Sequence, residues 1–186
     1  MSTHFFGLTD RTYSYSHSVG RSEFSGTGFR NPVDFALGAD DILYVLNRSY
    51  ENRPDGTHIT VCTMTEDYIS EFGSYGEDDG QFIWPTSVVL DKDEKVYVAD
   101  EWLNRITIFS KDGEFLGKWG TSGSGDGELD RPAGLAISAD QTMFVVDSRN
   151  SRVQKFTLDG KFLGKFGSFG SGSGEFNMPW GIGLGA

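Results

Sequence analysis

The sequence repeats itself at a fixed interval of 47 residues. Three prolines mark this interval: Pro85, Pro132 and Pro179. The same offset relates the segments 112–118 and 159–165, which read Asp-Gly-Glu-Phe-Leu-Gly-Lys and Asp-Gly-Lys-Phe-Leu-Gly-Lys. A constant repeat of this length is typical of chains built from tandem copies of one small structural unit. Any fold proposed for this chain must therefore be a stack of similar units.

Each unit contains short runs of strand-forming residues separated by turn residues. In the third unit there are four runs, at 131–137, 143–147, 153–157 and 161–167. Asp159 and Gly160 supply the positive φ angles that tight hairpins need. The 25 glycines, 15 phenylalanines and 7 tyrosines also favour strands and turns over helices. We therefore predict an all-β chain, a β-propeller of four-stranded antiparallel blades.

The repeat divides the chain into segments. We predict an N-terminal segment at 1–18, which can supply a ring-closing outer strand, blade 1 at 19–73, blade 2 at 74–120, blade 3 at 121–167 and the start of a truncated blade 4 at 168–186. Blade 1 is longer, because Pro32 and Pro85 are 53 residues apart and the extra residues fall near 48–57. Propellers have roughly 4–8 blades. About three and a half blades are thus expected to be a fragment of a six-bladed ring.

Composition narrows the partners and the compartment. The formal net charge of −11 repels phosphate backbones and anionic lipid surfaces, so nucleic acid and membrane partners are not expected. Cys62 is the single cysteine, so no internal disulfide can form. The N-terminus lacks the charged start and apolar run of a secretory signal. These features predict a cytoplasmic protein.

Recurring charged pairs are interpreted as architecture. Asp100 and Arg105 stand five residues apart across a predicted turn, and Asp147 and Arg152 repeat this spacing one unit later. A carboxylate that holds a guanidinium would fix each turn. A catalytic pair has no need to recur in every blade, so we predict a structural role for all four residues.

Other candidate chemistry lacks the required spacing. The acidic runs 77–79 and 91–94 do not match a calcium loop. The glycine-rich segments that begin at Gly73, Gly120 and Gly167, which we call the leads, lack the Lys-Ser/Thr of a phosphate-binding loop. His4, His17 and His58 share no metal-binding spacing and are expected at the surface or an edge. We predict no catalytic residue, no cofactor and no metal site, and hence no enzyme.

One edge of the blades is the predicted binding surface. In an antiparallel meander the lead into the first strand and the turn between the second and third strands leave the sheet at the same edge. Aromatic and arginine side chains are enriched at interface anchors. This edge is predicted to carry seven partner-binding candidates: Trp84, Arg131, Trp102, Arg149, Arg48, Tyr50 and Arg53.

The units resemble the NHL repeat over about residues 19–186. Blade 3 carries Pro132-Ala-Gly, Val145-Val-Asp, Asn150 and Arg152, followed by an outer Phe-Gly. Blade 2 has Leu103 in place of the first asparagine. Blade 1 departs most, with Asn47 for the aspartate and His58 where the arginine is expected, so it cannot form the same ion pair.

The resemblance implies function only loosely, because one fold hosts many functions. The leading hypothesis is a non-catalytic scaffold that binds a protein or peptide through the loop face. The alternative is a fragment of a metal-dependent lactonase-like or lyase-like propeller, with a small molecule in the central channel of the complete ring. The predicted first strands are mostly apolar and offer few ligands for such a metal, so the missing blades of the ring would have to supply them. Single-stranded RNA binding is a third reading, which the negative charge disfavours.

Overall fold

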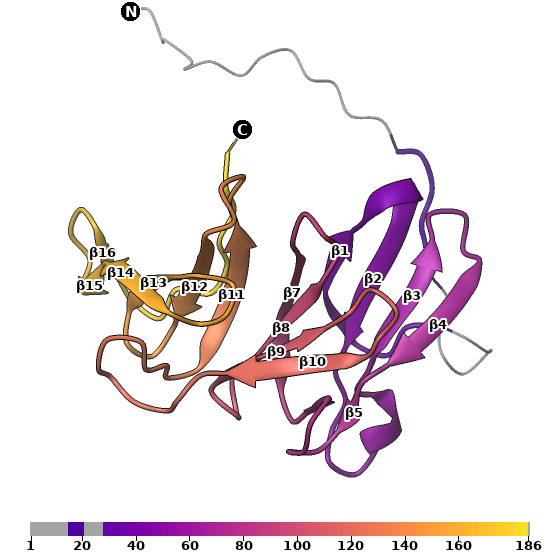
Figure 1. Ribbon diagram of the computed structural model, residues 1–186, viewed down its shortest axis with the longest axis horizontal. Helices are drawn as coiled ribbons and strands as arrows, with labels where there is room; N and C mark the ends of the chain where they lie inside the picture. The colour runs from indigo at the N-terminus through magenta and orange to yellow at the C-terminus, as the bar shows by residue number, and fades with distance from the viewer. Residues whose placement is uncertain (1–14, 21–27, 186) are drawn as a thin grey trace, which may run out of the picture.

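The computed structural model describes residues 15–20 and 28–185, and its regular structure is almost entirely β. Three four-stranded antiparallel sheets succeed one another along the chain, each in simple meander order (Figure 1). The predicted all-β fold and propeller blades are confirmed, and the described sheets do not close a ring. No helix in this part of the chain is long and apolar enough to span a membrane.

The strand bounds follow the repeat. The first sheet contains β1 (Pro32–Leu37), β2 (Ile42–Asn47), β3 (Ile59–Thr63) and β4 (Tyr68–Phe72). The second contains β7 (Pro85–Leu90), β8 (Val96–Asp100), β9 (Arg105–Phe109) and β10 (Phe115–Trp119). The third contains β11 (Pro132–Ile137), β12 (Met143–Asp147), β13 (Arg152–Phe156) and β14 (Phe162–Phe166). We call these sheets blades 1, 2 and 3.

Short elements connect the blades. Two-stranded parallel ladders pair β5 (Ser74–Tyr75) with β6 (Gln81–Phe82) and β15 (Ser168–Phe169) with β16 (Glu175–Phe176). They form inside the glycine-rich leads, which fold back on themselves before each new blade begins. Two short 3-10 helices, η2 (Ala39–Asp41) and η3 (Pro54–Gly56), lie in turns of blade 1.

The core lies between neighbouring blades. Successive side chains of a strand point to opposite faces of its sheet, so each blade offers one apolar face to each neighbour. Between blades 1 and 2, Phe82 and Phe109 are buried. Between blades 2 and 3, the residues 47 positions later, Leu129 and Phe156, occupy the equivalent buried places. The sequence repeat is therefore a repeat of packing contacts.

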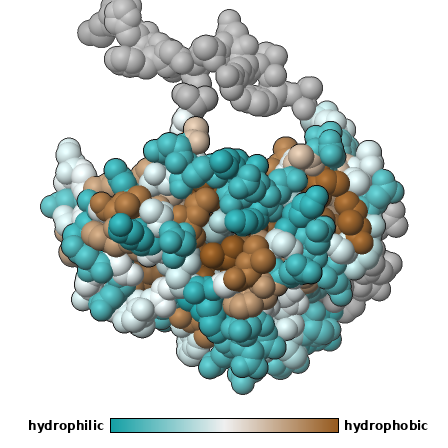
Figure 2. Space-filling view, viewed as in Figure 1, coloured by the Kyte–Doolittle hydropathy of each residue, from teal (hydrophilic) through white to brown (hydrophobic). Residues whose placement is uncertain are grey.

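The two outermost faces of the stack stay partly uncovered within the described residues. The outer face of blade 3 is formed around Val146 and Val153, and that of blade 1 around Leu43 and Val45. Hydrophobic residues reach the surface towards both ends of the stack in Figure 2. The open face of blade 3 corresponds to the face with which blades 1 and 2 pack on the next blade. The open face of blade 1 corresponds to the face with which blades 2 and 3 pack on the preceding blade.

Gly120 closes blade 2 in a conformation that other residues rarely adopt. Its φ is +124°, and a Cβ there would lie 2.6 Å from the carbonyl oxygen of Asn104. We expect Gly120→Ala to lower the free energy of unfolding by about 2 kcal/mol or more, because strain and a backbone clash add. Gly117 is the control, since a Cβ there has no neighbour within 4 Å. Urea denaturation of both variants measures the difference, and equal losses would contradict this reading.

Candidate binding rim

One edge of the stack gathers the leads and the turns between second and third strands. Backbone hydrogen bonds join them within each blade: Arg48 N–H donates to Asn31 O, Glu101 N–H to Trp84 O, and Ser148 N–H to Arg131 O. We call this edge the rim and define it as residues 30–31, 48–57, 83–84, 101–104, 130–131 and 148–151. All seven partner-binding candidates of the sequence analysis lie on it.

Neighbouring blades also touch at the rim. The guanidinium carbon of Arg48 lies 4.4 Å from the centroid of the Trp84 ring. The centroids of the Tyr50 and Trp84 rings are 6.1 Å apart. Arg48 and Tyr50 come from blade 1 and Trp84 from blade 2. The Arg131 N–H of blade 3 donates to Asn104 Oδ1 of blade 2 at 2.7 Å. The longer connection of blade 1 thus reaches the next blade.

Glu101 places a carboxylate within this group of residues. Burial raises the pKa of the half-buried Glu101 carboxyl, while the positive charges of Arg131 and Arg48 lower that pKa in part. No described ion pair joins Glu101 to either arginine within 4.0 Å. We call Arg48, Tyr50, Trp84, Glu101 and Arg131 the rim cluster.

Removing an arginine should move the titration of Glu101. Arg131 lowers the pKa of Glu101 more than Arg48 does, so we expect Arg131→Gln to raise this pKa further, as carboxyl-selective NMR titration would show. A raised folded-state pKa favours folding below the unfolded pKa of Glu101, and this contribution is lost as pH rises through the folded value. In the variant, whose folded-state pKa is higher, the stabilising contribution of Glu101 should persist to a higher pH before it is lost. Lys92→Gln, at the opposite edge, should leave the titration unchanged.

The other three candidates are exposed residues of the rim. Trp102 is 64 % exposed in the turn of blade 2, and Arg149 is exposed in the corresponding turn of blade 3. Arg53 is exposed in the long connection of blade 1, where its N–H donates to Tyr50 O. The structure therefore brings Trp84 into contact with both Arg48 and Tyr50, and the other four candidates lie on the same rim.

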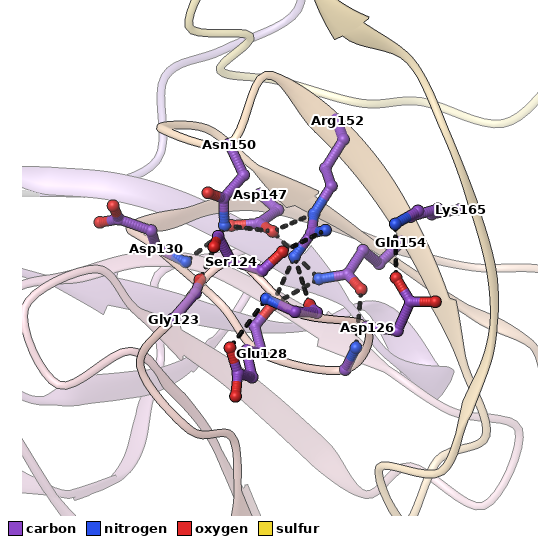
Figure 3. A network of polar contacts seen from close by, with 12 residues as sticks. Gly123, Ser124, Asp126, Glu128, Asp130, Asp147, Asn150, Arg152, Gln154 and Lys165 are labelled. Atoms are coloured by element: carbon purple, nitrogen blue, oxygen red, sulfur yellow. Dashed lines mark hydrogen bonds and ion pairs between the residues drawn. The ribbon is translucent and has the colours of Figure 1, made fainter.

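Beneath the rim, blade 3 has a buried ion pair between Arg152 and Asp147 (Figure 3). Arg152 Nε donates to Asp147 Oδ2 at 2.7 Å, and the other guanidinium nitrogens donate to the carbonyl oxygens of Ser124, Gly125 and Glu128. The Gln154 amide donates to Asp147 Oδ2 and to Glu128 O. One arginine thereby ties the glycine-rich lead to the sheet, which positions the rim residues that follow.

Blade 2 does not form the Asp100–Arg105 contact that the sequence analysis expected. The Arg105 guanidinium donates to the carbonyl oxygens of Glu77, Asp78 and Gln81, but its buried Nε has no partner. Asp100 instead accepts four backbone N–H bonds, from residues 83, 84, 102 and 103. Burial raises the pKa of Asp100, and these four hydrogen bonds lower it in part. The carboxylate is occupied by the rim backbone and so does not reach the arginine.

Blade 1 replaces the charged pair with amide chemistry. Asn47 is fully buried, accepts a hydrogen bond from Arg30 N–H, and donates to the backbone and to Thr60 Oγ1. His58 is 8 % exposed, so the expectation of a surface or edge histidine is wrong for it. The insertion folds over this residue, and His58 Nδ1 bonds Asp55 O. His17 is exposed, and His4 lies outside the described residues.

An inner cavity of about 310 Å³ lies along β1, β7 and β11 and the segment 180–182. Asp34 lines it and accepts hydrogen bonds from Ser87 Oγ at 2.7 Å and Val88 N–H at 2.9 Å. This contact was not predicted, because the first strands read as mostly apolar, although Asp34 inside a predicted strand was an available signal. Within the described residues no group of three or more His, Cys, Asp or Glu side chains could hold a metal ion.

Comparison with known proteins adds one repeat match and several fold matches. Residues 129–156 match the NHL repeat. No curated protein matches the chain. A streptogramin B lyase structure has a TM-score of 0.59 at 14 % identity, over 83 % of this chain and 45 % of its own. Hydrazine synthase from Kuenenia stuttgartiensis has a TM-score of 0.59 at 15 % identity, over 91 % and 42 %.

A catalytically inactive virginiamycin B lyase from Staphylococcus aureus, solved with quinupristin, has a TM-score of 0.58 at 12 % identity, over 81 % of this chain and 44 % of its own. The chain thus spans less than half the length of these structures. At such identities the likeness concerns the fold alone. The resemblance to the NHL repeat is confirmed where the repeat is most regular, in blade 3.

Proposed function

Because residues 129–156 form an NHL repeat within a propeller-type stack of blades, we propose that the chain is a non-catalytic scaffold that binds a protein or peptide partner at its rim. The observation that carries this proposal is the rim cluster, in which an arginine, a tyrosine and a tryptophan from two blades meet at the surface. Residues of these types supply most of the binding energy in protein interfaces.

The rim is also where the repeat is broken. The buried Phe109 recurs as Phe156 in the next unit. The residue before each repeat proline instead changes from Trp84 to Arg131 to Met178, and the long connection occurs only in blade 1. Packing between equivalent blades favours residues of similar character at equivalent positions, whereas one partner meets several blades at once and favours a different residue on each. This contrast supports a binding role for the rim.

The proposal is tested with a displayed library of random peptides. Replacing Trp84, Trp102 and Arg131 together by alanine should reduce recovery of peptides selected on the unmodified chain by about 30-fold or more, the loss expected when hot-spot residues are removed. The circular dichroism spectrum should not change, because these side chains lie outside the buried core.

The matched control replaces three lysines of the opposite edge, Lys92, Lys111 and Lys161, by alanine. This variant should recover the selected peptides as well as the unmodified chain does. Equal recovery by the rim variant would contradict the proposal, and so would a loss in the lysine variant alone.

A further inference from the structure

Arginine and lysine are segregated in this fold. All described arginines lie at the rim or at the strand end directly beneath it: Arg30, Arg48, Arg53, Arg105, Arg131, Arg149 and Arg152. The described lysines lie in turns of the opposite edge or on the outer two strands: Lys92, Lys95, Lys111, Lys118, Lys155, Lys161 and Lys165. Arginine differs from lysine in its planar fork of donors, which matches a carboxylate in two-point contact. The rim therefore has a chemistry that the rest of the described surface lacks.

Several rim guanidiniums keep their donors available. Arg105 and Arg152 bind carbonyl oxygens of the leads, and Arg30 pairs with Asp55. The side chains of Arg48, Arg131 and Arg149, in contrast, donate no hydrogen bond to any described residue, and Arg48 only stacks on Trp84. Stacking holds the Arg48 plane in place while its edge remains free to bind.

Arg48 and Arg131 approach the turn of blade 2 from the two neighbouring blades. Both Arg48 and Arg131 lower the pKa of Glu101 from their separate blades. Arg48 lies over Trp84, whose carbonyl oxygen accepts from Glu101 N–H, and Arg131 N–H donates to Asn104 Oδ1 in the same turn. No described ion pair joins either guanidinium to Glu101. Tyr50, which is 62 % exposed, and Trp84 provide apolar surface directly beside these charges. The cluster thus combines a charged part and an apolar part within one contact area.

We propose that the rim ligand is an acidic peptide segment of a protein partner, with an Asp or Glu carboxylate between Arg48 and Arg131 and a neighbouring apolar side chain on Tyr50 and Trp84. The inference rests on the proposed scaffold function and specifies its partner. Bidentate hydrogen bonds from arginine would hold the carboxylate.

A long polyanion fits this surface less well than a short acidic segment. The leads carry Asp78, Asp79, Asp126 and Asp130, of which Asp79 pairs with Lys118 and Asp126 with Lys165, and the net charge of the chain is −11. Nucleic acid needs many phosphate contacts along its length, which these carboxylates would repel. One or two peptide carboxylates can be placed at the arginines and avoid the acidic leads.

The experiment compares two fluorescein-labelled pools of random peptides by polarisation. The first pool draws on Asp, Glu, Leu, Phe, Ser and Gly, and the second replaces Asp and Glu by Asn and Gln. We expect the full chain to bind the acidic pool at least about 10-fold more tightly, the effect of one charge-assisted pair. Arg48→Glu with Arg131→Glu should abolish that preference, whereas Lys92→Glu with Lys111→Glu at the opposite edge should retain it.

The possible outcomes separate the inference from the proposed function. Equal, rim-dependent binding of both pools would overturn the acidic ligand and leave the scaffold standing. Binding of neither pool at the rim would overturn both. A single-stranded RNA oligonucleotide serves as the third probe, and its preferred binding at the rim, weakening steeply with salt, would also overturn the acidic peptide. Arg48→Lys should bind the acidic pool more weakly than the unmodified chain, because it keeps the charge and loses the fork.

Discussion

Replacing Arg152 by alanine should destabilise the chain by about 3–5 kcal/mol, because it leaves the buried Asp147 carboxylate without its cation. Asp147 is fully buried, and its Oδ2 accepts from Arg152 Nε. The same substitution also removes the guanidinium hydrogen bonds to three carbonyl oxygens of the lead. Urea denaturation followed by tryptophan fluorescence would measure the change in the free energy of unfolding.

Arg105→Ala is the matched comparison within the same chain. It removes the guanidinium hydrogen bonds to the equivalent carbonyl oxygens of blade 2 but removes no ion pair, since Asp100 is held by backbone N–H groups. We expect this loss to be smaller by at least about 1 kcal/mol, the usual difference between a charged and a neutral buried partner. Equal losses in the two variants would show that the ion pair adds nothing beyond the bonds to the lead.

The sheets could be predicted from sequence because the repeat copies packing as well as strands. Leu129 and Phe156 take the places of Phe82 and Phe109, so a constant interval implies the same neighbours in each blade. The rim could also be predicted, because antiparallel order alone decides which connections share an edge. Both inferences depend on backbone topology and not on side-chain detail.

Side-chain competition was not predictable in the same way. Arg105 and Arg152 occupy equivalent positions, yet only Arg152 binds its aspartate. Gln154 and Asn150 both donate to Asp147, and blade 2 has Thr107 and Leu103 at those positions. These differences are visible in the sequence. Their effect depends on which donors lie within hydrogen-bond distance of each carboxylate oxygen, which the sequence does not give.

Contacts of the insertion were equally beyond prediction. The stacking of Arg48 on Trp84 requires the longer connection of blade 1 to lean towards blade 2, and the burial of His58 requires it to fold back over β3. A connection that occurs once has no second copy in the chain with which to compare it. The seven binding candidates were therefore predictable as residues of one edge. Which of them contact one another in the rim cluster was not.

The exposed outer faces of the stack should make the chain self-associate at micromolar concentration. Apolar side chains that face a neighbouring blade inside the stack lie open at its ends, and burying them is worth about 25 cal/mol per Å². The outer face of blade 3 has a pocket lined by Phe166, Phe176 and Leu184. Phe166, which lies beside Phe176, and Leu184 are each 45 % exposed. Sedimentation velocity over a concentration series should show a weight-average mass above that of one chain.

Charging that face should disperse the assembly. Phe166→Glu with Leu184→Glu places carboxylates on the outer face of blade 3, and we expect association to weaken by at least about 10-fold, since unpaired charges are costly to bury. Leu163→Glu is the matched control: Leu163 lies on the same strand, is 51 % exposed and does not line the pocket. If Leu163→Glu weakens association as much as the pair, then the contact is not made by the blade face. A chain that sediments as a monomer at every concentration would show that these faces need no cover.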